Sequence, residues 1–177
     1  MRSAVIYIVA VLVANLTATW FLHFPIFGQV AVGTFVFGFT FTQRDRMHAK
    51  GRRFVYTVIA ITAALSALLS VLGQVPPRII LASVIAIVLA ETADTEVYQR
   101  LLAKSWWHRV LTSNAVSIPL DSIFFNVVAF AGVAGFPPTV ILSIIFGEIV
   151  VKTLVGAVSA FWRGRESDRP VSDRASA

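Results

Sequence analysis

Apolar runs of about 20 residues recur along this chain, and they constrain its fold more than any other feature. A helix of that length spans the hydrocarbon core of a bilayer. A soluble domain would instead show polar residues at every helical or strand period. With 57% hydrophobic and 14% charged residues, the chain has more apolar side chains than one soluble core can hide. We therefore predict an all-α, polytopic integral membrane protein.

Six segments are long and apolar enough to be candidate spans. The fourth is the least regular, because its apolar part ends near Ala90 and the acidic stretch ETADTEVYQRLL follows. This segment can cross a bilayer only if its acidic part lies beside other helices. The predicted spans are residues 3–24, 26–42, 54–72, 79–102, 111–133 and 139–162.

The basic residues indicate which way these spans run. Of the 15 Lys and Arg residues, 13 lie at the N-terminus, in two connectors or in the C-terminal tail. The connectors are QRDRMHAKGRR and the segment 100–109. Because cytoplasmic loops are enriched in Lys and Arg, we predict six crossings with both termini in the cytoplasm. This placement also accounts for the net charge of +6 without a nucleic-acid partner.

The chain is predicted to have one structured part and one tail. Residues 1–162 are expected to form a six-helix transmembrane transport domain. The segment 163–177 is polar and lacks an apolar period, so we expect a disordered cytoplasmic tail. His48 and His108 lie in the basic connectors and are expected to be solvated. The chain has no cysteine, which excludes Cys-based metal sites, and neither a metal nor a cofactor is predicted.

Polar side chains in the fifth span are the first candidates for a site. A carboxylate at the bilayer centre costs at least about 2.5 kcal/mol, so it calls for a partner, water or a proton. Helical spacing places Asn114, Ser117 and Asp121 on one face, with Phe125 farther along it. Pro119 predicts a kink beside Asp121. We predict that Asp121 is functional, whereas Asn114 and Ser117 fit helix packing as well as a direct role.

Two other spans carry charged candidates. In the fourth, Glu91 is the deeper acid and favours a functional role, whereas Asp94 and Glu96 also fit the solvated headgroup region. In the sixth, Glu148 precedes Lys152 by four residues, the order that favours an ion pair. Such a pair fits coupling or gating, and it also fits a structural lock between two helices. Asp94 is a further candidate for coupling or gating.

The motifs around these residues resemble a known family. They are GTFVFGFTFTQRDRMHAKGRR, AETADTEVYQRLLAKSWW, SNAVSIPLDSIFFNVVAF and FGEIVVKTLV, in this order. Together they resemble the YhhQ family of queuosine-precursor transporters, also called the VUT family of vitamin uptake transporters. The resemblance implies a bacterial inner-membrane protein that imports 7-cyano- or 7-aminomethyl-7-deazaguanine to salvage the modified tRNA base queuosine. The positions that match the family's acids and lysine are Asp94, Asp121, Glu148 and Lys152.

A deazaguanine substrate gives the candidate residues a chemical role. Its ring N–H and exocyclic amine form a pair of donors that one carboxylate can accept, and its flat faces can stack on aromatic rings. Asp121 is the first candidate for this acceptor, with Glu91 and Glu148 as alternatives. Asn114 and Ser117 are expected to meet the carbonyl or the 7-substituent, and Phe125 to cover the ring.

Three functions remain open from the sequence. The first is facilitated or ion-coupled transport, with the bilayer and the substrate as partners and a homo-oligomer left open. The second is the substrate-binding subunit of an energy-coupling-factor vitamin importer, which needs an ATPase module. A small-residue stripe of Ala10, Ala14 and Ala18 permits close helix packing, and with six short helices it also resembles such a subunit. The third is an enzyme that uses Asp121 and Glu148 as acid and base. The sequence has no Walker loop, HExxH or GxSxG motif, so we expect a transporter and not an enzyme.

Overall fold

Helices make up most of the structure, a computed structural model that describes residues 2–26 and 28–167. Within these residues it contains six α-helices, one short two-stranded sheet and a single 3₁₀ turn. The all-α prediction is therefore confirmed. The helices are α1 (Arg2–Leu16), α2 (Val32–Met47), α3 (Arg52–Leu72), α4 (Pro77–Arg100), α5 (Trp106–Phe130) and α6 (Pro138–Ser167).

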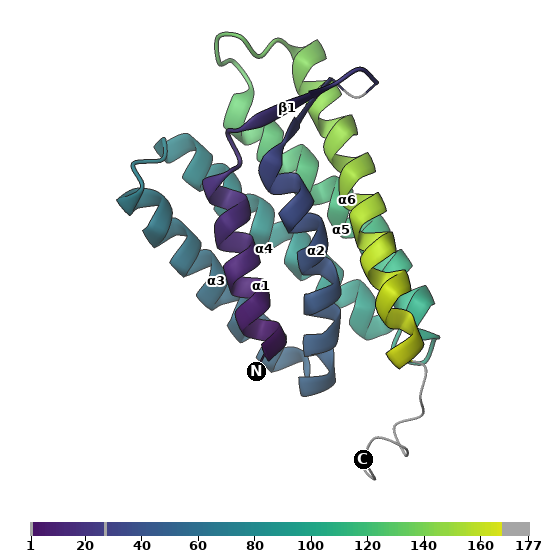
Figure 1. Cartoon of the computed structure of the whole chain (residues 1–177). Coiled ribbons are helices and arrows are strands. Elements are labelled where there is room, and N and C mark those ends of the chain that lie inside the picture. Colours follow the sequence, from purple (N-terminus) through teal and green to yellow (C-terminus); the bar gives the residue numbers. More distant parts are fainter. Residues whose placement is uncertain (1, 27, 168–177) are drawn as a thin grey trace.

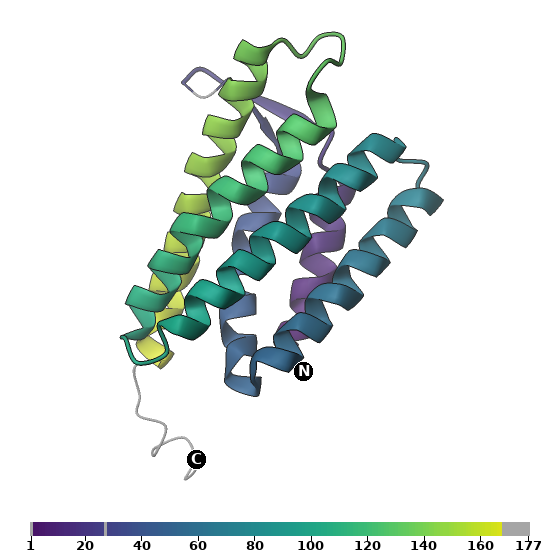
Figure 2. The same ribbon diagram turned by 180° about the vertical axis from the view of Figure 1, so that it is seen from behind.

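Successive helices run in opposite directions along one bundle (Figure 1). The beginning of α1 and the end of α6 lie at the same end of the bundle, which we call the terminal end. The opposite end carries the small sheet, and we call it the hairpin end. From behind, α3, α4 and α5 form a layer in front of α1 and α2 (Figure 2). Neighbouring helices pack in the order α1, α2, α6, α5, α4, α3 and back to α1.

The outer surface of the bundle is apolar, as expected for a protein in a membrane. Large hydrophobic side chains such as Leu68, Leu142 and Phe161 are exposed, and they are better solvated by lipid than by water. Helices α3, α5 and the Pro138–Phe161 part of α6 are long and apolar enough to cross a bilayer. Helix α4 is long enough, with 24 residues, but its acidic residues make it less apolar than these three. Helix α1 is apolar but shorter. The number of six crossings stays a prediction.

The adjoining ends of the first two predicted spans, 3–24 and 26–42, differ from the prediction. Helix α1 ends at Leu16, and the chain then forms two antiparallel strands, β1 (Phe21–Phe24) and β2 (Gly28–Ala31). The prediction that residues 17–24 and 28–31 belong to helical spans is wrong. Gly28 begins β2 with a φ of 75°, which suits a turn and not a right-handed helix.

Small residues allow α1 and α2 to approach closely. Gly33, near the start of α2, faces the backbone carbonyl of Ala14, and a Cβ atom at Gly33 would collide with that oxygen. The predicted stripe of Ala10, Ala14 and Ala18 is buried inside the chain. The stripe therefore serves packing within the bundle.

Two predicted segments at the terminal end also have different boundaries. Helix α6 continues to Ser167, past the predicted start of the tail at residue 163, and the rest of that tail, 168–177, lies outside the described residues. Arg44 and Asp45 belong to α2 and are 0% and 3% exposed. The prediction that they form part of a connector is wrong, because their side chains turn inward among buried polar groups.

Candidate functional site

A buried lysine on α6 holds together the first of two charged clusters. Lys152 Nζ lies 2.7 Å from Asp121 Oδ2 on α5 and 2.9 Å from Glu148 Oε2 one turn earlier on α6. It also donates a hydrogen bond to Ser122 Oγ at 2.9 Å. We call these four residues the lysine cluster. The predicted pairing of Glu148 with Lys152 is confirmed, and Asp121 joins it across the interface between α5 and α6.

The lysine cluster has more negative than positive groups. One ammonium faces two carboxylates, and the side chains of Asp121 and Glu148 are only 8% and 3% exposed. When all three groups are ionised, one negative charge lacks a partner within the cluster. Such a charge is costly away from water unless a proton, a cation or a ligand donor compensates it. The cluster is therefore suited to bind a positively charged or donor-rich group.

A pocket borders the lysine cluster on the side of the hairpin end. Asp121, Glu148 and Lys152 line it together with Phe37 and Phe125 and with residues of α1 and α4. The volume of this pocket that water can enter is about 40 Å³. A typical ligand pocket has roughly 300 Å³ or more. In this conformation the pocket is closed to a purine-sized molecule, so binding requires the helices to separate.

The wall of the pocket toward α1 and α4 adds neutral polar groups. Asn15 and Ser83 line it, and Ser83 Oγ donates to Asn15 Oδ1 at 2.9 Å. The Asn15 amide also donates to Ser66 of α3. These contacts fix the orientation of the amide and leave polar atoms beside the aromatic rings. The pocket thus combines aromatic faces, amide and hydroxyl groups, and an excess carboxylate.

Arg44 organises the second cluster, which lies nearer the terminal end. Its Nη1 is 2.9 Å from Glu91 Oε2 and its Nη2 is 2.6 Å from Asp94 Oδ1, both on α4. Nη2 also donates to Asn114 Oδ1 at 3.3 Å, and Ser117 Oγ donates to Asp94 Oδ1 at 3.0 Å. We call these five residues the arginine cluster. The planar guanidinium can bond both carboxylates at once, which a lysine could not do with the same geometry.

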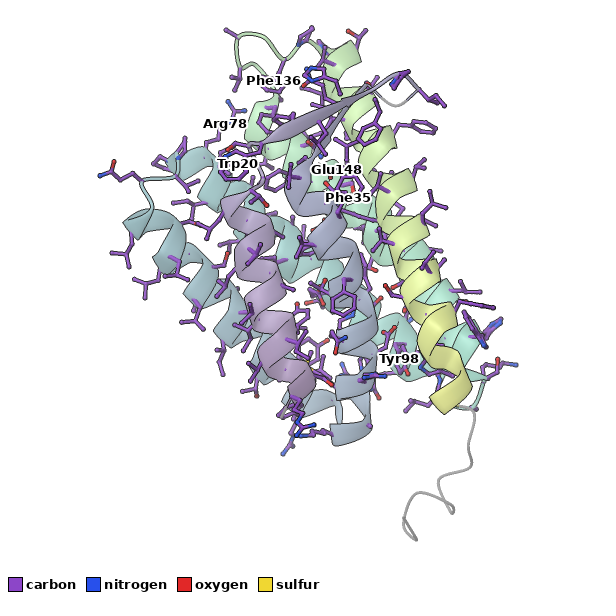
Figure 3. All side chains as sticks on the ribbon, in the orientation of Figure 1. Trp20, Phe35, Arg78, Tyr98, Phe136 and Glu148 are labelled. Carbon is purple, nitrogen blue, oxygen red and sulfur yellow. The ribbon has the colours of Figure 1, made fainter. Side chains whose placement is uncertain are left out.

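The structure divides the predicted binding residues between the two clusters. Asp121 and Phe125 line the pocket, whereas Glu91, Asn114 and Ser117 belong to the arginine cluster. Glu148 lies in the half of the bundle nearer the hairpin, and Tyr98 near the terminal end (Figure 3). The two clusters are therefore stacked along the bundle instead of forming one site.

Asp94 and Glu96, two acids on α4, differ in their exposure. Asp94 is fully buried, so its interpretation as a solvated headgroup residue is wrong. Its carboxylate is stabilised instead by the ion pair with Arg44 and the hydrogen bond from Ser117. Glu96 is different, because its side chain is 30% exposed and pairs with Arg52 and Tyr56 of α3 at the surface.

Several residues of the two clusters and of the pocket were not predicted. Arg44 stands in a basic stretch, where its charge indicates a cytoplasmic connector. Ser122 and Ser83 are small hydroxyl residues of a kind that is common in transmembrane helices. Asn15 is the exception, because a single amide in an otherwise apolar span is a signal that sequence reasoning could have used.

His48 is buried, although it was expected to be solvated. It lies in the turn η1 (His48–Lys50) after α2, and its ring stacks on Tyr98 with centroids 4.1 Å apart. Its Nδ1 is 3.0 Å from the Gln99 amide nitrogen. Burial, followed by the nearby charges of Arg44 and Arg109, lowers the pKa of His48 to about 3. The imidazole is therefore neutral at physiological pH.

One comparison with known proteins assigns the chain to a family. A family model described as "Putative vitamin uptake transporter" matches residues 31–162, from α2 into the last part of α6. The match includes every residue of the lysine and arginine clusters. Comparisons with curated proteins and with solved structures give no match. Because the matched region takes in most of the chain, the protein belongs to the family of vitamin uptake transporters that the charged motifs resemble.

Proposed function

We propose that this protein imports 7-deazaguanine precursors of queuosine, 7-cyano-7-deazaguanine or its 7-aminomethyl analogue, across the bacterial inner membrane. The observation that carries the proposal is the excess carboxylate of the lysine cluster at the wall of the pocket. A deazaguanine presents two adjacent N–H donors, which suit a carboxylate acceptor. The resemblance of the charged motifs supplies the substrate class, and the family match supports uptake as the activity.

The lining of the pocket suggests how such a ligand is held. Asp121 is the proposed acceptor for the donor pair, while Glu148 stays bound to Lys152. Phe37 and Phe125 lie on the pocket wall and can cover the faces of the ring. The carbonyl and the 7-substituent are proposed to meet Asn15 and Ser83. These two residues take the part that the sequence assigned to Asn114 and Ser117.

The positions of the two clusters along the bundle suggest how the pocket opens to one side of the membrane and then to the other. On α2, α4 and α5 the arginine cluster lies nearer the terminal end than the pocket residues do. Its ion pairs join α2 to α4 and close the bundle on that side. We propose that transport requires these pairs to separate, so that the pocket opens toward the terminal end.

Asp121→Asn tests the proposed acceptor. The amide keeps the shape of the side chain but replaces one of the two acceptor oxygens by an N–H donor and removes the charge, so uptake should fall about 10- to 100-fold. The measurement is uptake of 7-cyano-7-deazaguanine by a strain that cannot make it, read out as queuosine in tRNA. Glu96→Gln is the matched control, because it makes the same change on the surface of α4. Normal uptake by Asp121→Asn, with the usual amount of protein in the membrane, would contradict the proposal.

Reconstitution of the chain by itself distinguishes this importer from the energy-coupling-factor alternative. We expect proteoliposomes that contain only this protein to accumulate or equilibrate the labelled substrate and to release it chemically unchanged. Uptake that appears only after an ATPase module is added would favour the alternative. A chemically altered product would instead favour an enzyme.

A further inference from the structure

We propose that Asp45, His48 and Asp94 form a binding site for a divalent transition-metal cation at the terminal end of the bundle. Each side chain offers one ligand atom, and these atoms all lie within 4.8 Å of one another. Two donors bound to one ion at roughly 2.0–2.4 Å can be at most about 4.8 Å apart. The three side chains are therefore close enough to coordinate a single ion.

The unsatisfied polar atoms of these side chains also point to a cation. Among the described residues, both carboxylate oxygens of Asp45, Oδ2 of Asp94 and Nε2 of His48 are buried and have no hydrogen-bond partner. The three residues are 3%, 0% and 7% exposed. Buried polar groups in native proteins are nearly always paired. When ionised, these carboxylate oxygens can only accept, so a cation can satisfy all of them together, whereas two ionised carboxylates cannot satisfy one another.

The local charges favour a divalent ion. Arg44 is the cation nearest the site, and it faces the three carboxylates of Glu91, Asp94 and Asp45. When all three carboxylates are ionised, these four residues carry a net charge of −2. Arg109 also acts electrostatically on Asp45 and offsets part of this charge, and its guanidinium lies over the ring of Tyr98 at 5.3 Å from the centroid. A divalent ion would compensate the net charge of Arg44 and the three carboxylates.

The types of ligand indicate which cation fits. One imidazole with two carboxylates suits Zn²⁺ or Mn²⁺, whereas Mg²⁺ prefers oxygen ligands and retained water. His48 would bind through Nε2, because Nδ1 faces the Gln99 amide at 3.0 Å. If the amide turns its oxygen toward the ring, it accepts the Nδ1 proton and holds the tautomer in which Nε2 is free. Stacking on Tyr98 fixes the plane of the ring.

The position of the site gives metal binding a structural consequence. Asp45 belongs to α2 and His48 to the turn that follows it, whereas Asp94 belongs to α4. Asp94 Oδ1 bonds Arg44, and its free oxygen Oδ2 would bind the metal. A bound ion would therefore join α2, η1 and α4 beside the arginine cluster. We expect it to raise the thermal stability of the folded protein.

A metal titration of the purified full-length chain tests the site. The protein is prepared in detergent without a histidine tag, stripped with EDTA and titrated with Zn²⁺, Mn²⁺ and, as a spectroscopic probe, Co²⁺. We expect one ion per chain, a visible Co²⁺ absorption band and a higher melting temperature. His48→Gln and Asp45→Asn should each weaken binding at least about tenfold. His108→Gln is the matched control, because His108 is exposed on α5 and should leave binding unchanged.

The outcomes decide the proposal even if a variant misfolds. No saturable binding to the wild-type protein below about 1 mM would overturn it, since metal sites built from three protein ligands bind more tightly than this. Equal affinity of His48→Gln and His108→Gln, with both proteins monodisperse on size exclusion, would overturn it as well. Transport activity is not needed for either result, so failure of the proposed import function is a separate finding.

Discussion

A single buried arginine joins α2 to α4 in the half of the bundle nearer the termini. Arg44→Met should lower the free energy of unfolding by about 3–5 kcal/mol, because it leaves Glu91 and Asp94 buried without their cation. The measurement is denaturant unfolding in detergent micelles. Arg53→Met, an exposed arginine at the start of α3, should change stability by less than about 0.5 kcal/mol.

Neutralising both acids should recover much of that loss. The triple variant Arg44→Met, Glu91→Gln, Asp94→Asn removes the uncompensated charges together with the arginine, so we expect it to be more stable than Arg44→Met alone. If Arg44→Met unfolds at the wild-type denaturant concentration, the arginine cluster does not hold α2 and α4 together.

The contrast between Arg44 and Lys152 shows what could be predicted for single residues. Lys152, Glu148 and Asp121 stand in apolar stretches, where any charge needs a partner, and their importance was predictable. Arg44 stands among other basic residues, and the composition of that stretch predicts a connector exposed to solvent. Only the position of α4 in space shows that Arg44 turns inward.

At the scale of secondary-structure elements, the close contact between α1 and α2 is the most sensitive to substitution. Gly33→Ala places a methyl group against the Ala14 carbonyl, which is backbone and cannot move aside by a rotamer change. We expect a destabilisation of about 1–3 kcal/mol, measured as a lower melting temperature in detergent. Because Ala14 and Gly33 both line the pocket, substrate uptake should fall as well.

Gly156→Ala is the matched control for that substitution. Gly156 is also a helical glycine, on α6, but a Cβ there would lie 3.7 Å from the nearest atom, Nδ2 of Asn114, which is ordinary contact. Alanine has a higher helix propensity than glycine, so this variant should be neutral or slightly stabilised. A stability loss equal to that of Gly33→Ala would argue against close packing as the cause.

The elements themselves were predictable to different degrees. Helices α3, α5 and α6 follow from their apolar length, whereas α4 continues past its apolar part into an acidic stretch; the observed ends of all four lie near the predicted ones. The hairpin of β1 and β2 does not follow from the sequence pattern, because its residues are as apolar as the spans on either side. The small residues of α1 were recognised as a packing stripe, but their partner Gly33 becomes visible only when α2 is placed against α1.

At the scale of the whole molecule, the sequence could not predict which helices are neighbours. Helix α2 packs against α1, which is adjacent in sequence, and also against α6, which is distant in sequence. This arrangement brings Phe37 of α2 to the same pocket as Lys152 of α6. Helical periodicity orients each helix about its own axis but does not order the helices around the bundle. Apart from Arg44 and Ser122, the residues of the two clusters could therefore be named, but their division into separate sites could not be predicted.

The orientation of the whole bundle in the membrane gives the last prediction. The chain contains no cysteine, so single cysteines can be introduced into an unchanged background. Ala134 lies in the exposed loop between α5 and α6 at the hairpin end, whereas Ala49 and Lys104 are exposed at the terminal end. Because basic loops stay in the cytoplasm, a membrane-impermeant maleimide added to intact spheroplasts should label Ala134→Cys only.

Permeabilising the membrane supplies the control for this experiment. All three cysteines should then be labelled, which shows that each is reactive and that the bilayer alone protected the two at the terminal end. Six crossings require Ala49→Cys and Lys104→Cys to behave alike, since two spans separate them. Labelling of one but not the other in intact spheroplasts would mean that α3 and α4 do not both cross, and labelling of both from outside would reverse the orientation.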